Sequence, residues 1–477
     1  MGAGDAPALQ LGQRVLNYTE LNRRVGQMAK WLEGKADPGD RIASWLAKGE
    51  MTCLLPLACA RAGLVHVPVN PVLKRVQVAH ILADSGALVL ITNAARAATL
   101  EPGDLGAARL CDDAQALAAI DHCAVLPPSS APVDHLVALL YTSGSTGRPK
   151  GVMISHANLW LGAHSVAYYT RLLPGDRILA VLPLAFDYGQ NQLLSAWHAG
   201  ACVVPHDYLV PRDVLRAVER FSITTLAGVP PLWRQLAAFS WPAGLRRLTN
   251  SGGALDGTLV RRLRALAPGA DLYAMYGLTE AFRSTYLDPA LIDAHPTSIG
   301  GAIPYAEVMV VGDDGAPGDE GELVHAGPLV AQGYWRDAAR TAERFRPAPA
   351  WSRSGGTAVW SGDRVMRDAA GLLYFVGRGD AMIKTAGNRV SPQDVEDAAL
   401  ATGLVGDVVA FGVPDHVLGH AIHCVASPAG DSAALIAAMA RDLPGFMLPR
   451  VVHWRDALPL NANGKVDRAA LYRELSA

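Results

Sequence analysis

The feature that most restricts the fold is an alternation of short apolar runs with amphipathic stretches between Val133 and Gly277. The apolar runs predict β-strands at Leu136–Tyr141, Ile223–Val229, Arg246–Asn250 and Leu272–Tyr276. The stretches with helical spacing predict helices at Arg212–Phe221, Pro231–Phe239 and Asp256–Leu266, the last begun by an aspartate cap. This alternation indicates an α/β fold in which helices cover a parallel sheet, and such sheets bind ligands outside the carboxyl ends of their strands.

The pattern changes after Gly300. Short strands separated by glycine, proline and aspartate turns are predicted at Ala306–Val311, Gly321–His325 and Leu372–Val376, so we expect a small β-rich subdomain. A last α+β unit begins near Asp380, with strands at Ala381–Lys384, Asp407–Val413 and Ala421–Ser427 and helices at Pro392–Leu400 and Ser432–Asp442. We therefore predict a large N-terminal domain at residues 1–379 and a small C-terminal domain at residues 380–477.

The charge balance argues against a broad basic surface for nucleic acid or an anionic membrane. The chain has 477 residues and a formal net charge of −2, from 42 basic and 44 acidic residues, with no basic block. Its six cysteines are scattered without a CxxC pair, which argues against a structural zinc site or a disulfide framework. No signal peptide and no apolar run of ~18 residues is visible, so we expect a cytoplasmic protein without a membrane span.

The strongest chemical signal is the loop YTSGSTGRPKG at residues 141–151, which directly follows a predicted strand. Its glycines let the backbone fold closely around a ligand and point N–H groups inward, as a polyphosphate requires. The hydroxyl groups and the two cations add further donors and positive charge. The loop is not a Walker A motif, because the GxxxxGK[ST] spacing is absent. The candidate phosphate-binding residues are Thr142, Ser143, Gly144, Ser145, Thr146, Gly147, Arg148 and Lys150.

This loop resembles the phosphate loop of the superfamily of acyl-CoA synthetases, nonribosomal-peptide adenylation domains and luciferases. Three further motifs follow in the order of that superfamily: YGLTE at 276–280, WSGD at 360–363 with Gly377-Arg378, and NGK at 463–465. The stretch YGLTEAFRSTYLDP is most similar to acyl-CoA ligases associated with exosortase A systems. The resemblance implies an AMP-forming ligase that uses ATP and Mg²⁺ to activate a carboxylic acid, with coenzyme A or a phosphopantetheinyl carrier protein as the thiol partner.

The resemblance also assigns roles in the nucleotide site. By its position, Glu280 would help to hold Mg²⁺ and Thr279 would contact the phosphates. Tyr276 would pack against the adenine ring, and the Gly252-Gly253 stretch would line the base pocket. Adenylation brings two negative groups together, so positioning and charge neutralisation are what these residues must supply.

Other assigned roles belong to later motifs. Asp363 would accept hydrogen bonds from the ribose hydroxyls, with Arg378 close by, although Ser361 replaces the usual threonine of the Thr-Gly-Asp motif. Lys465 matches the lysine that bridges the acid and the phosphate oxygens from the mobile C-terminal domain. Asp380 matches the hinge of that domain. Gly387 matches the glycine that lines the pantetheine channel, although it could also be an ordinary turn glycine.

Three residues concern the acid substrate. Phe186-Asp187 stands where peptide-synthetase domains carry a Phe-Asp pair whose aspartate binds the amine of the substrate. Asp187 could therefore bind an ammonium group or pair with an internal arginine. Arg283 could anchor a second carboxylate or polar group of the substrate, or it could instead neutralise Asp187. Both charges argue against a long fatty chain, which prefers an apolar tunnel.

The leading hypothesis is an acid–thiol ligase for a small polar or amine-bearing acid. A strict amino-acid adenylation enzyme that loads a stand-alone carrier protein is the main alternative, and it depends on Asp187. A luciferase-like oxidative enzyme has no specific support. A non-catalytic adenylate-binding module is the remote alternative, against which the presence of all the expected catalytic residues argues.

Overall fold

The structure is a computed structural model, and it describes residues 3–142, 149–253, 255, 257–378, 383–459 and 468–476. The chain divides into two compact units. The larger consists of Met1–Pro71, Ala79–Tyr141 and Gly151–Gly377, and the smaller of Val72–Val78, Thr142–Lys150 and Arg378–Ala477. The predicted domain boundary at residue 380 lies outside the described residues and stays a prediction.

The larger unit contains the predicted parallel strands. Neighbouring strands run parallel in the order β10-β9-β11-β12-β13. Their bounds are Cys202–Pro205 for β10, Arg177–Ala180 for β9, Thr225–Gly228 for β11, Arg247–Asn250 for β12 and Asp271–Leu278 for β13. Beyond β10 lie β1 (Pro7–Leu11), which is parallel to it, and β2 (Arg14–Asn17), which is antiparallel to β1.

The β-rich region predicted after Gly300 is present and its strands are antiparallel, but it does not form a separate sheet. Strand β13 turns back into β14 (Phe282–Tyr286), which pairs with β15 (Ser298–Ala302), and β15 pairs with β20 (Leu373–Arg378). The remaining strands follow in the order β20-β19-β17-β16, with β18 beside β19. They are β16 (Glu307–Val311), β17 (Glu320–Ala326), β18 (Phe345–Pro347) and β19 (Thr357–Arg367). One continuous sheet therefore joins the predicted nucleotide motifs of both regions.

A second sheet of the larger unit has the strand order β6-β5-β3-β4-β7-β8. Its bounds are β3 Arg41–Trp45, β4 Val65–Pro68, β5 Val89–Thr92, β6 Arg109–Asp112, β7 Leu136–Thr142 and β8 Lys150–Ser155. Strand β7 was expected from the sequence, whereas the strands that precede it were not. The accompanying helices are α1 Tyr18–Glu33, α2 Glu50–Arg61, α3 Arg75–Ser85, α4 Ala94–Ala97 and α5 Asp113–Ile120.

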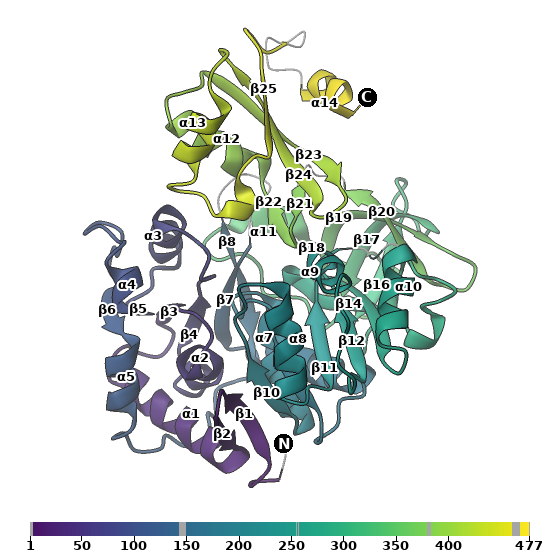
Figure 1. Cartoon of the computed structure of the whole chain (residues 1–477). Coiled ribbons are helices and arrows are strands. Elements are labelled where there is room, and N and C mark those ends of the chain that lie inside the picture. Colours follow the sequence, from purple (N-terminus) through teal and green to yellow (C-terminus); the bar gives the residue numbers. More distant parts are fainter. Residues whose placement is uncertain are drawn as a thin grey trace. The chain divides into compact units, whose positions relative to one another are not determined.

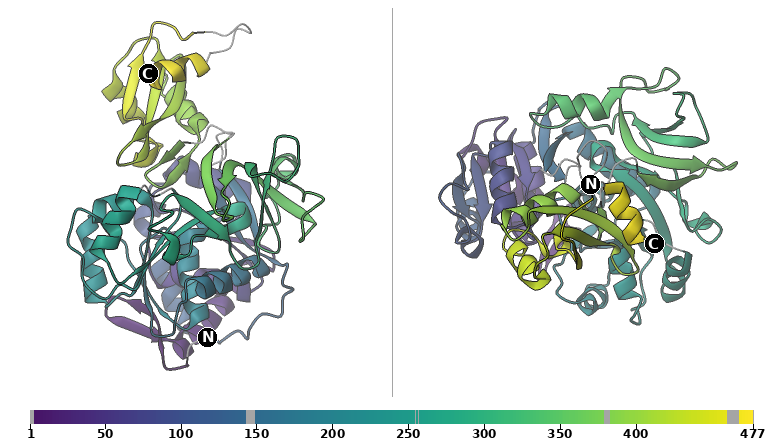
Figure 2. Two further views of the ribbon diagram at one scale, coloured as in Figure 1. Left: turned by 90° about the vertical axis from the view of Figure 1, so that its right-hand side faces the viewer. Right: turned by 90° about the horizontal axis from the view of Figure 1, so that it is seen from above.

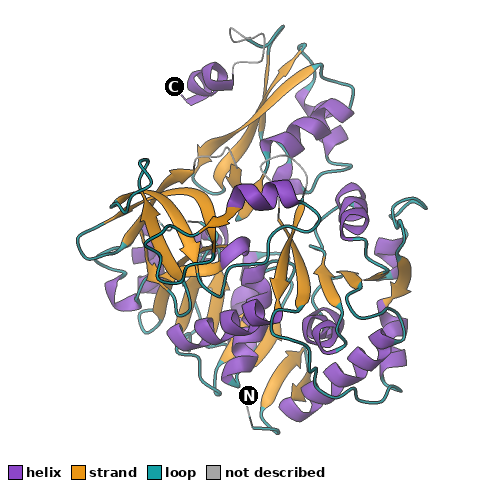
Figure 3. Cartoon of the chain, turned by 180° about the vertical axis from the view of Figure 1, so that it is seen from behind, coloured by secondary structure: helices purple, strands orange, loops and turns teal. Residues whose placement is uncertain are grey.

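Helices cover both faces of the parallel strands (Figures 1 and 3). Successive residues of a strand point to opposite faces, so Ile178 packs with α1, α2 and α7 (Asp187–Ala199), whereas Leu179 packs with α8–α10. The second group of helices consists of α8 (Pro211–Arg220), α9 (Pro230–Leu236) and α10 (Gly257–Leu266), seen together in teal in Figure 2. The remaining helices of the unit are α6 (His156–Tyr169) and α11 (Ala338–Arg344), together with the short turns η1 (Thr279–Ala281) and η2 (Pro289–Leu291).

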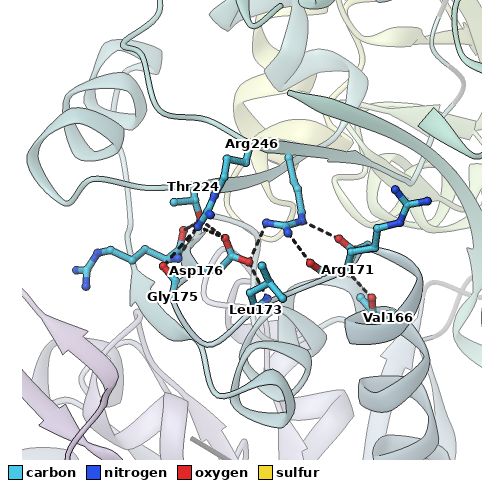
Figure 4. Close-up of polar contacts among 10 residues, drawn as sticks. Val166, Arg171, Leu173, Gly175, Asp176, Thr224 and Arg246 are labelled. Carbon is cyan, nitrogen blue, oxygen red and sulfur yellow. Dashed lines mark hydrogen bonds and ion pairs between the residues drawn. The ribbon is translucent and has the colours of Figure 1, made fainter. Parts of the chain in front are cut away.

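A buried carboxylate ties the strands together just before β9. Asp176 is 1% exposed and accepts hydrogen bonds from Thr224 Oγ1 at 2.7 Å and from Arg246 Nη2 at 2.6 Å (Figure 4). Its second oxygen accepts from Arg247 Nη1 at 2.8 Å and from the backbone N–H of Leu173 at 2.8 Å. Each oxygen of this buried acid therefore has two donors, which compensates its desolvation.

The smaller unit has the predicted α+β composition. Its sheet has the order β22-β21-β24-β23, with β25 beside β24. The strands are β21 Ile383–Thr385, β22 Asn388–Val390, β23 Asp407–Asp415, β24 Gly419–Ser427 and β25 Val451–Trp454, and the helices are α12 Pro392–Ala401, α13 Ser432–Met439, η3 Gly445–Met447 and α14 Arg468–Ser476. Val395, Val408, Ile422 and Leu435 share one core, so this unit buries its own apolar residues. Within the described part of the chain, no helix has the length and apolar character needed to cross a bilayer.

Candidate active site

The YGLTE motif forms a tight reversal between β13 and β14. The chain passes through the η1 turn at Thr279–Ala281, and Phe282 then adopts φ 59° and ψ −160°, a backbone conformation that is strained for a residue with a side chain. Gly277 allows this reversal, because a Cβ at that position would lie 2.5 Å from Arg283 Cα. Thr279 and Glu280 therefore lie in the turn itself, and Arg283 lies at the start of the returning strand β14.

Glu280 is held by a buried tyrosine that the sequence analysis missed. Glu280 is 6% exposed, and the Tyr334 hydroxyl donates to its Oε1 at 2.7 Å. The backbone N–H of Ala331 also donates to the Glu280 carbonyl at 2.8 Å. Burial and the neighbouring carboxylate raise the pKa of Tyr334, so this phenol remains a donor at neutral pH. The contact fixes the direction of the carboxylate predicted to hold the metal.

The carboxylate chemistry of Glu280 fits Mg²⁺. This cation takes oxygen ligands and is usually bound by one or two carboxylates together with substrate phosphates. Among the described residues, no group of three or more His, Cys, Asp or Glu side chains is arranged to hold a metal ion. A single carboxylate such as that of Glu280 is the kind of ligand that a cation shared with a nucleotide uses.

The predicted adenine and ribose residues are linked directly. Tyr276 donates its hydroxyl hydrogen to Asp363 Oδ2, although the two residues are far apart in the sequence. Asp363 is 1% exposed, and its backbone N–H donates to Ser361 Oγ at 3.0 Å. The Ser361 hydroxyl in turn donates to the carbonyl of Leu323, so serine performs the local hydrogen bonding that its position requires. The positive φ of 68° at Gly362 explains the glycine of this motif.

His325 packs behind Tyr276 and was not predicted. The two rings are stacked, with centroids 6.0 Å apart and an angle of 18° between their planes. His325 is 1% exposed, and burial lowers its pKa to about 4, so the imidazole is neutral at pH 7. It supports the tyrosine as an aromatic platform.

The predicted base-pocket glycines follow the carboxyl end of β12. Gly252 has φ 78°, which favours glycine. The Asn250 side-chain amide donates to the Gly253 carbonyl at 2.9 Å and fixes the loop. A Cβ at Gly253 would approach Pro230 Cγ at 3.0 Å, so the loop packs tightly against the start of α9. This position outside the strand ends agrees with the ligand site expected for a parallel sheet.

The acid-pocket residues lie at the start of α7. Phe186 is the N-cap residue and Asp187 is the first residue of the helix. Gly189 is required there, because a Cβ would lie 1.9 Å from the Pro183 carbonyl oxygen. Asp187 accepts a hydrogen bond from Thr279 Oγ1 at 3.4 Å, so the acid-pocket and phosphate motifs meet. Asp187 is partly exposed, yet burial of its carboxyl group raises its pKa.

Arg283 lies beside Asp187 without closing an ion pair with it among the described residues. The guanidinium is 2% exposed and lies 4.9 Å from the centroid of the Tyr188 ring and 4.8 Å from that of Phe282. Its charge lowers the pKa of Asp187, against the larger raising effect of burial. Its Nε and one terminal nitrogen have no hydrogen-bond partner within the described structure. The buried guanidinium of Arg283 is therefore near enough either to anchor a group of the substrate or to neutralise Asp187.

A small pocket opens between α7 and the YGLTE turn. It is lined by Asp187, Gln190, Asn191, Thr279 and other residues, namely Leu140, Ile154, Asn158, Leu159, Leu194, Phe282 and Leu329. Gln190 and Asn191 were not predicted as site residues. Their only sequence signal is polar character at positions of α7 that share a face with Asp187.

Several predicted site residues are described only in part, or lie outside the described residues. Thr142 ends β7 and Lys150 begins β8, whereas Ser143, Gly144, Ser145, Thr146, Gly147 and Arg148 lie outside the described residues, as do Asp380 and Lys465. Only the backbone of Arg378, at the end of β20, is described. Gly387 has φ 77° and follows Ala386, with φ 49°, in the two-residue turn between β21 and β22. Two consecutive positive φ values are typical of a type I′ hairpin turn.

Comparisons with known proteins agree with this arrangement. The AMP-binding enzyme family model matches residues 2–335, and the model of the AMP-binding enzyme C-terminal domain matches residues 394–465. The chain is 34% identical to feruloyl-CoA synthase of Amycolatopsis sp over 484 residues, which cover 98% of this chain and 96% of that protein. It is 31% identical to part of a probable non-canonical nonribosomal peptide synthetase of Salinispora arenicola, covering 98% of this chain and 6% of that protein. A solved structure of a malonyl-CoA ligase, with methylmalonyl-CoA and AMP bound, has a TM-score of 0.82 and 27% identity, covering 96% of this chain and 98% of that one.

The chain therefore belongs to the AMP-binding enzyme family. It is an AMP-forming acid–thiol ligase, and enzymes of this family use ATP. The predicted family and α/β fold are confirmed, whereas the finer likeness to exosortase A-associated ligases stays a prediction.

Proposed function

We propose that this enzyme activates a small polar or amine-bearing carboxylic acid as an acyl-adenylate and transfers the acyl group to a pantetheine thiol. The observation that carries this proposal is the contact between Asp187 and Thr279, because it joins a charged acid pocket to the phosphate motif. Arg283 adds a second buried charge beside the same pocket. Two charges so near the reacting end are unfavourable for a long alkyl chain.

In the first step a carboxylate oxygen attacks the α-phosphorus of ATP, and pyrophosphate leaves. Thr279 would contact the phosphates, and Lys465 would bridge the acid and the phosphate oxygens, since a compact ammonium suits both anions. Glu280, oriented by Tyr334, would hold Mg²⁺. When bound, the cation neutralises phosphate charge that would otherwise repel the carboxylate.

In the second step the thiol attacks the acyl carbonyl carbon, and AMP leaves. The acceptor is the pantetheine thiol of coenzyme A or of a carrier protein. Relatives of both kinds support these choices, because one is named a feruloyl-CoA synthase and another a nonribosomal peptide synthetase. Asp380 as the hinge and Gly387 in the pantetheine channel belong to this proposal.

A strict amino-acid adenylation enzyme is the second candidate, and Asp187 favours it. A partly buried carboxylate with a raised pKa gains from a cationic partner, which a substrate ammonium would supply. ATP–pyrophosphate exchange with amino acids, small polar acids and fatty acids tests both candidates. Exchange only with amine-bearing acids supports the second candidate, exchange with plain polar acids supports the first, and exchange only with fatty acids contradicts both.

The role of Lys465 has its own test. Lys465→Ala should reduce adenylation by about 100-fold or more, because it removes a charge used in the transition state. ATP binding, measured by calorimetry, should persist. Exchange at the wild-type rate in this variant would contradict the role proposed for Lys465.

A further inference from the structure

We infer that the acid activated by this enzyme carries, beyond its reacting carboxylate, a neutral group that both donates and accepts hydrogen bonds, and that Gln190 and Asn191 bind it. A hydroxyl or a carboxamide is such a group. The inference rests on the proposed function and makes its substrate class more specific. It assigns specificity to two residues that neither the motifs nor the ion chemistry identified.

The side-chain amides of Gln190 and Asn191 are buried without hydrogen-bond partners in the described part of the chain. Gln190 and Asn191 are each 1% exposed. Neither the oxygen nor the nitrogen of either side-chain amide has a hydrogen-bond partner among the described residues. Burying an amide in this way is unfavourable, because its bonds to water are lost and not replaced.

A third amide in the same pocket, that of Asn158, is fully hydrogen-bonded. Asn158 also lines it, yet its amide nitrogen donates to the carbonyls of Pro328 at 3.0 Å and Val330 at 3.1 Å. Its oxygen accepts from the Ser155 N–H at 3.0 Å. The fold therefore satisfies the amide that it uses for structure, and it leaves the two on α7 directed to a ligand.

Gln190 and Asn191 share a helix face with Asp187. Asp187, Gln190, Asn191 and Leu194 follow the spacing i, i+3, i+4, i+7 and so share one face of α7. That face lines the pocket that also contains Thr279. A substrate whose carboxylate reaches the phosphate motif therefore presents its other end to the two amides.

The lining of this pocket fits a group that both donates and accepts hydrogen bonds. Gln190 and Asn191 together offer two acceptor oxygens and two donor N–H₂ groups. A hydroxyl or carboxamide complements this set, whereas an alkyl group leaves it unpaired. A second carboxylate at this end would meet Asp187 on the same helix face. Apolar residues such as Leu159, Leu194 and Phe282 supply the rest of the wall, so the recognised group is compact.

The test uses pairs of acids that match in size and differ in this group. ATP–pyrophosphate exchange is measured for valerate against γ-hydroxybutyrate and for isocaproate against succinamate. The corresponding amino acids are norvaline against homoserine and leucine against asparagine. We expect kcat/KM to be at least about 100-fold higher for the polar member of the preferred pair, because a site that forms hydrogen bonds rejects analogues that lack them. Equal or faster reaction of norvaline and leucine would overturn the inference while leaving the proposed function intact, whereas equal or faster reaction of valerate and isocaproate would count against both.

Variants of Gln190 and Asn191 supply two readouts, the melting temperature of the ligand-free enzyme and the preference among the acids. Gln190→Met and Asn191→Leu should raise the Tm of the ligand-free enzyme and shift the preference toward the apolar acids, because each replaces an unpaired buried amide with an apolar group. The matched control is Gln192→Met on the same helix. Gln192 is 5% exposed, and its Nε2 donates to the Leu179 carbonyl at 3.2 Å, although its Oε1 has no partner within the described structure. Of the three variants only this control gives up a hydrogen bond that the structure describes, so it should lower Tm.

The outcomes separate the inference from the function on which it rests. If Gln190→Met and Asn191→Leu lower Tm as Gln192→Met does, the two amides are structural and the inference is wrong. If their acid preference remains that of the wild type, the inference is also wrong. Exchange with none of the eight acids and with no acid of the broader set would overturn the proposed function, and this inference with it.

Discussion

Asp176 and Asp187 lie at or just before the start of two consecutive elements, the strand β9 and the helix α7, and they differ in the hydrogen bonds that their carboxylates accept. Asp176, before β9, accepts two hydrogen bonds on each oxygen, from Thr224, Arg246, Arg247 and Leu173 (Figure 4). Asp187, at the start of α7, accepts a long side-chain bond from Thr279 and has an arginine nearby without an ion pair in the described structure. A buried carboxylate that accepts two hydrogen bonds on each oxygen, a closed network, is typical of a structural role. A carboxylate with fewer donors, an incomplete network, can still bind a ligand.

The largest effect is expected from opening the closed network. Asp176→Ala leaves the guanidinium of Arg247, whose side chain is 8% exposed, without its carboxylate. Breaking a buried ion pair in this way costs roughly 3–5 kcal/mol of unfolding free energy. Urea unfolding measures the loss. Arg246→Ala is the control and should cost less, because the side chain of Arg246 is 48% exposed. Equal losses in the two variants would contradict a central role for the buried pair.

The second largest effect lies in the incomplete network and concerns activity. Asp187→Asn keeps the shape of the side chain but removes its charge. We expect acid-dependent exchange to fall by about 100-fold, equivalent to ~2.7 kcal/mol, because a charge-assisted contact to the substrate is lost. The urea midpoint should not fall. A variant that lost stability and kept its activity would make Asp187 structural, like Asp176.

A third carboxylate stands between these extremes. Glu280 accepts a hydrogen bond from the buried Tyr334 phenol on Oε1 and is also proposed to bind a metal, so its carboxylate would serve both the structure and a ligand. Tyr334→Phe should lower kcat/KM by about 10-fold, the value of one hydrogen bond of ~1.4 kcal/mol, and should raise the Mg²⁺ concentration for half-maximal rate. Titration of Mg²⁺ in the exchange assay measures both. An unchanged Mg²⁺ requirement would separate Tyr334 from the metal.

Local patterns predicted the elements of the fold because each pattern depends on neighbouring residues. The strand expected at Ile223–Val229 is β11 at Thr225–Gly228, and the helix expected at Pro231–Phe239 is α9 at Pro230–Leu236. The continuity of the sheet through the β13–β14 reversal was not predicted. It depends on the strained backbone of Phe282 and on the close approach at Gly277, which the sequence does not reveal.

The candidate site divides in the same way. Residues within recognisable motifs, such as Asp187, Glu280 and Asp363, could be found from the sequence. Tyr334 and His325 could not, because each acts through a partner that is distant in the chain. Gln190 and Asn191 have only a weak sequence signal, polar character on the face of α7 that carries Asp187, and their lack of partners among the described residues is a property of packing that the sequence does not encode.

The smallest expected effect is a pH dependence that distinguishes Asp187 from a structural acid. Burial raises the pKa of its carboxyl group in the folded state above the ordinary value of ~3.9. Protonated Asp187 therefore favours folding, and its contribution is fully present below the unfolded pKa and is lost as pH rises through the folded pKa. At pH 7 the ionised carboxylate destabilises the ligand-free enzyme, so Asp187→Asn should have a slightly higher Tm there. The difference should shrink as pH falls toward 4, and melting curves of both proteins across this range measure it. A difference that stays constant with pH would mean that the substitution acts through packing, and Asp187 would then lose its distinction from Asp176.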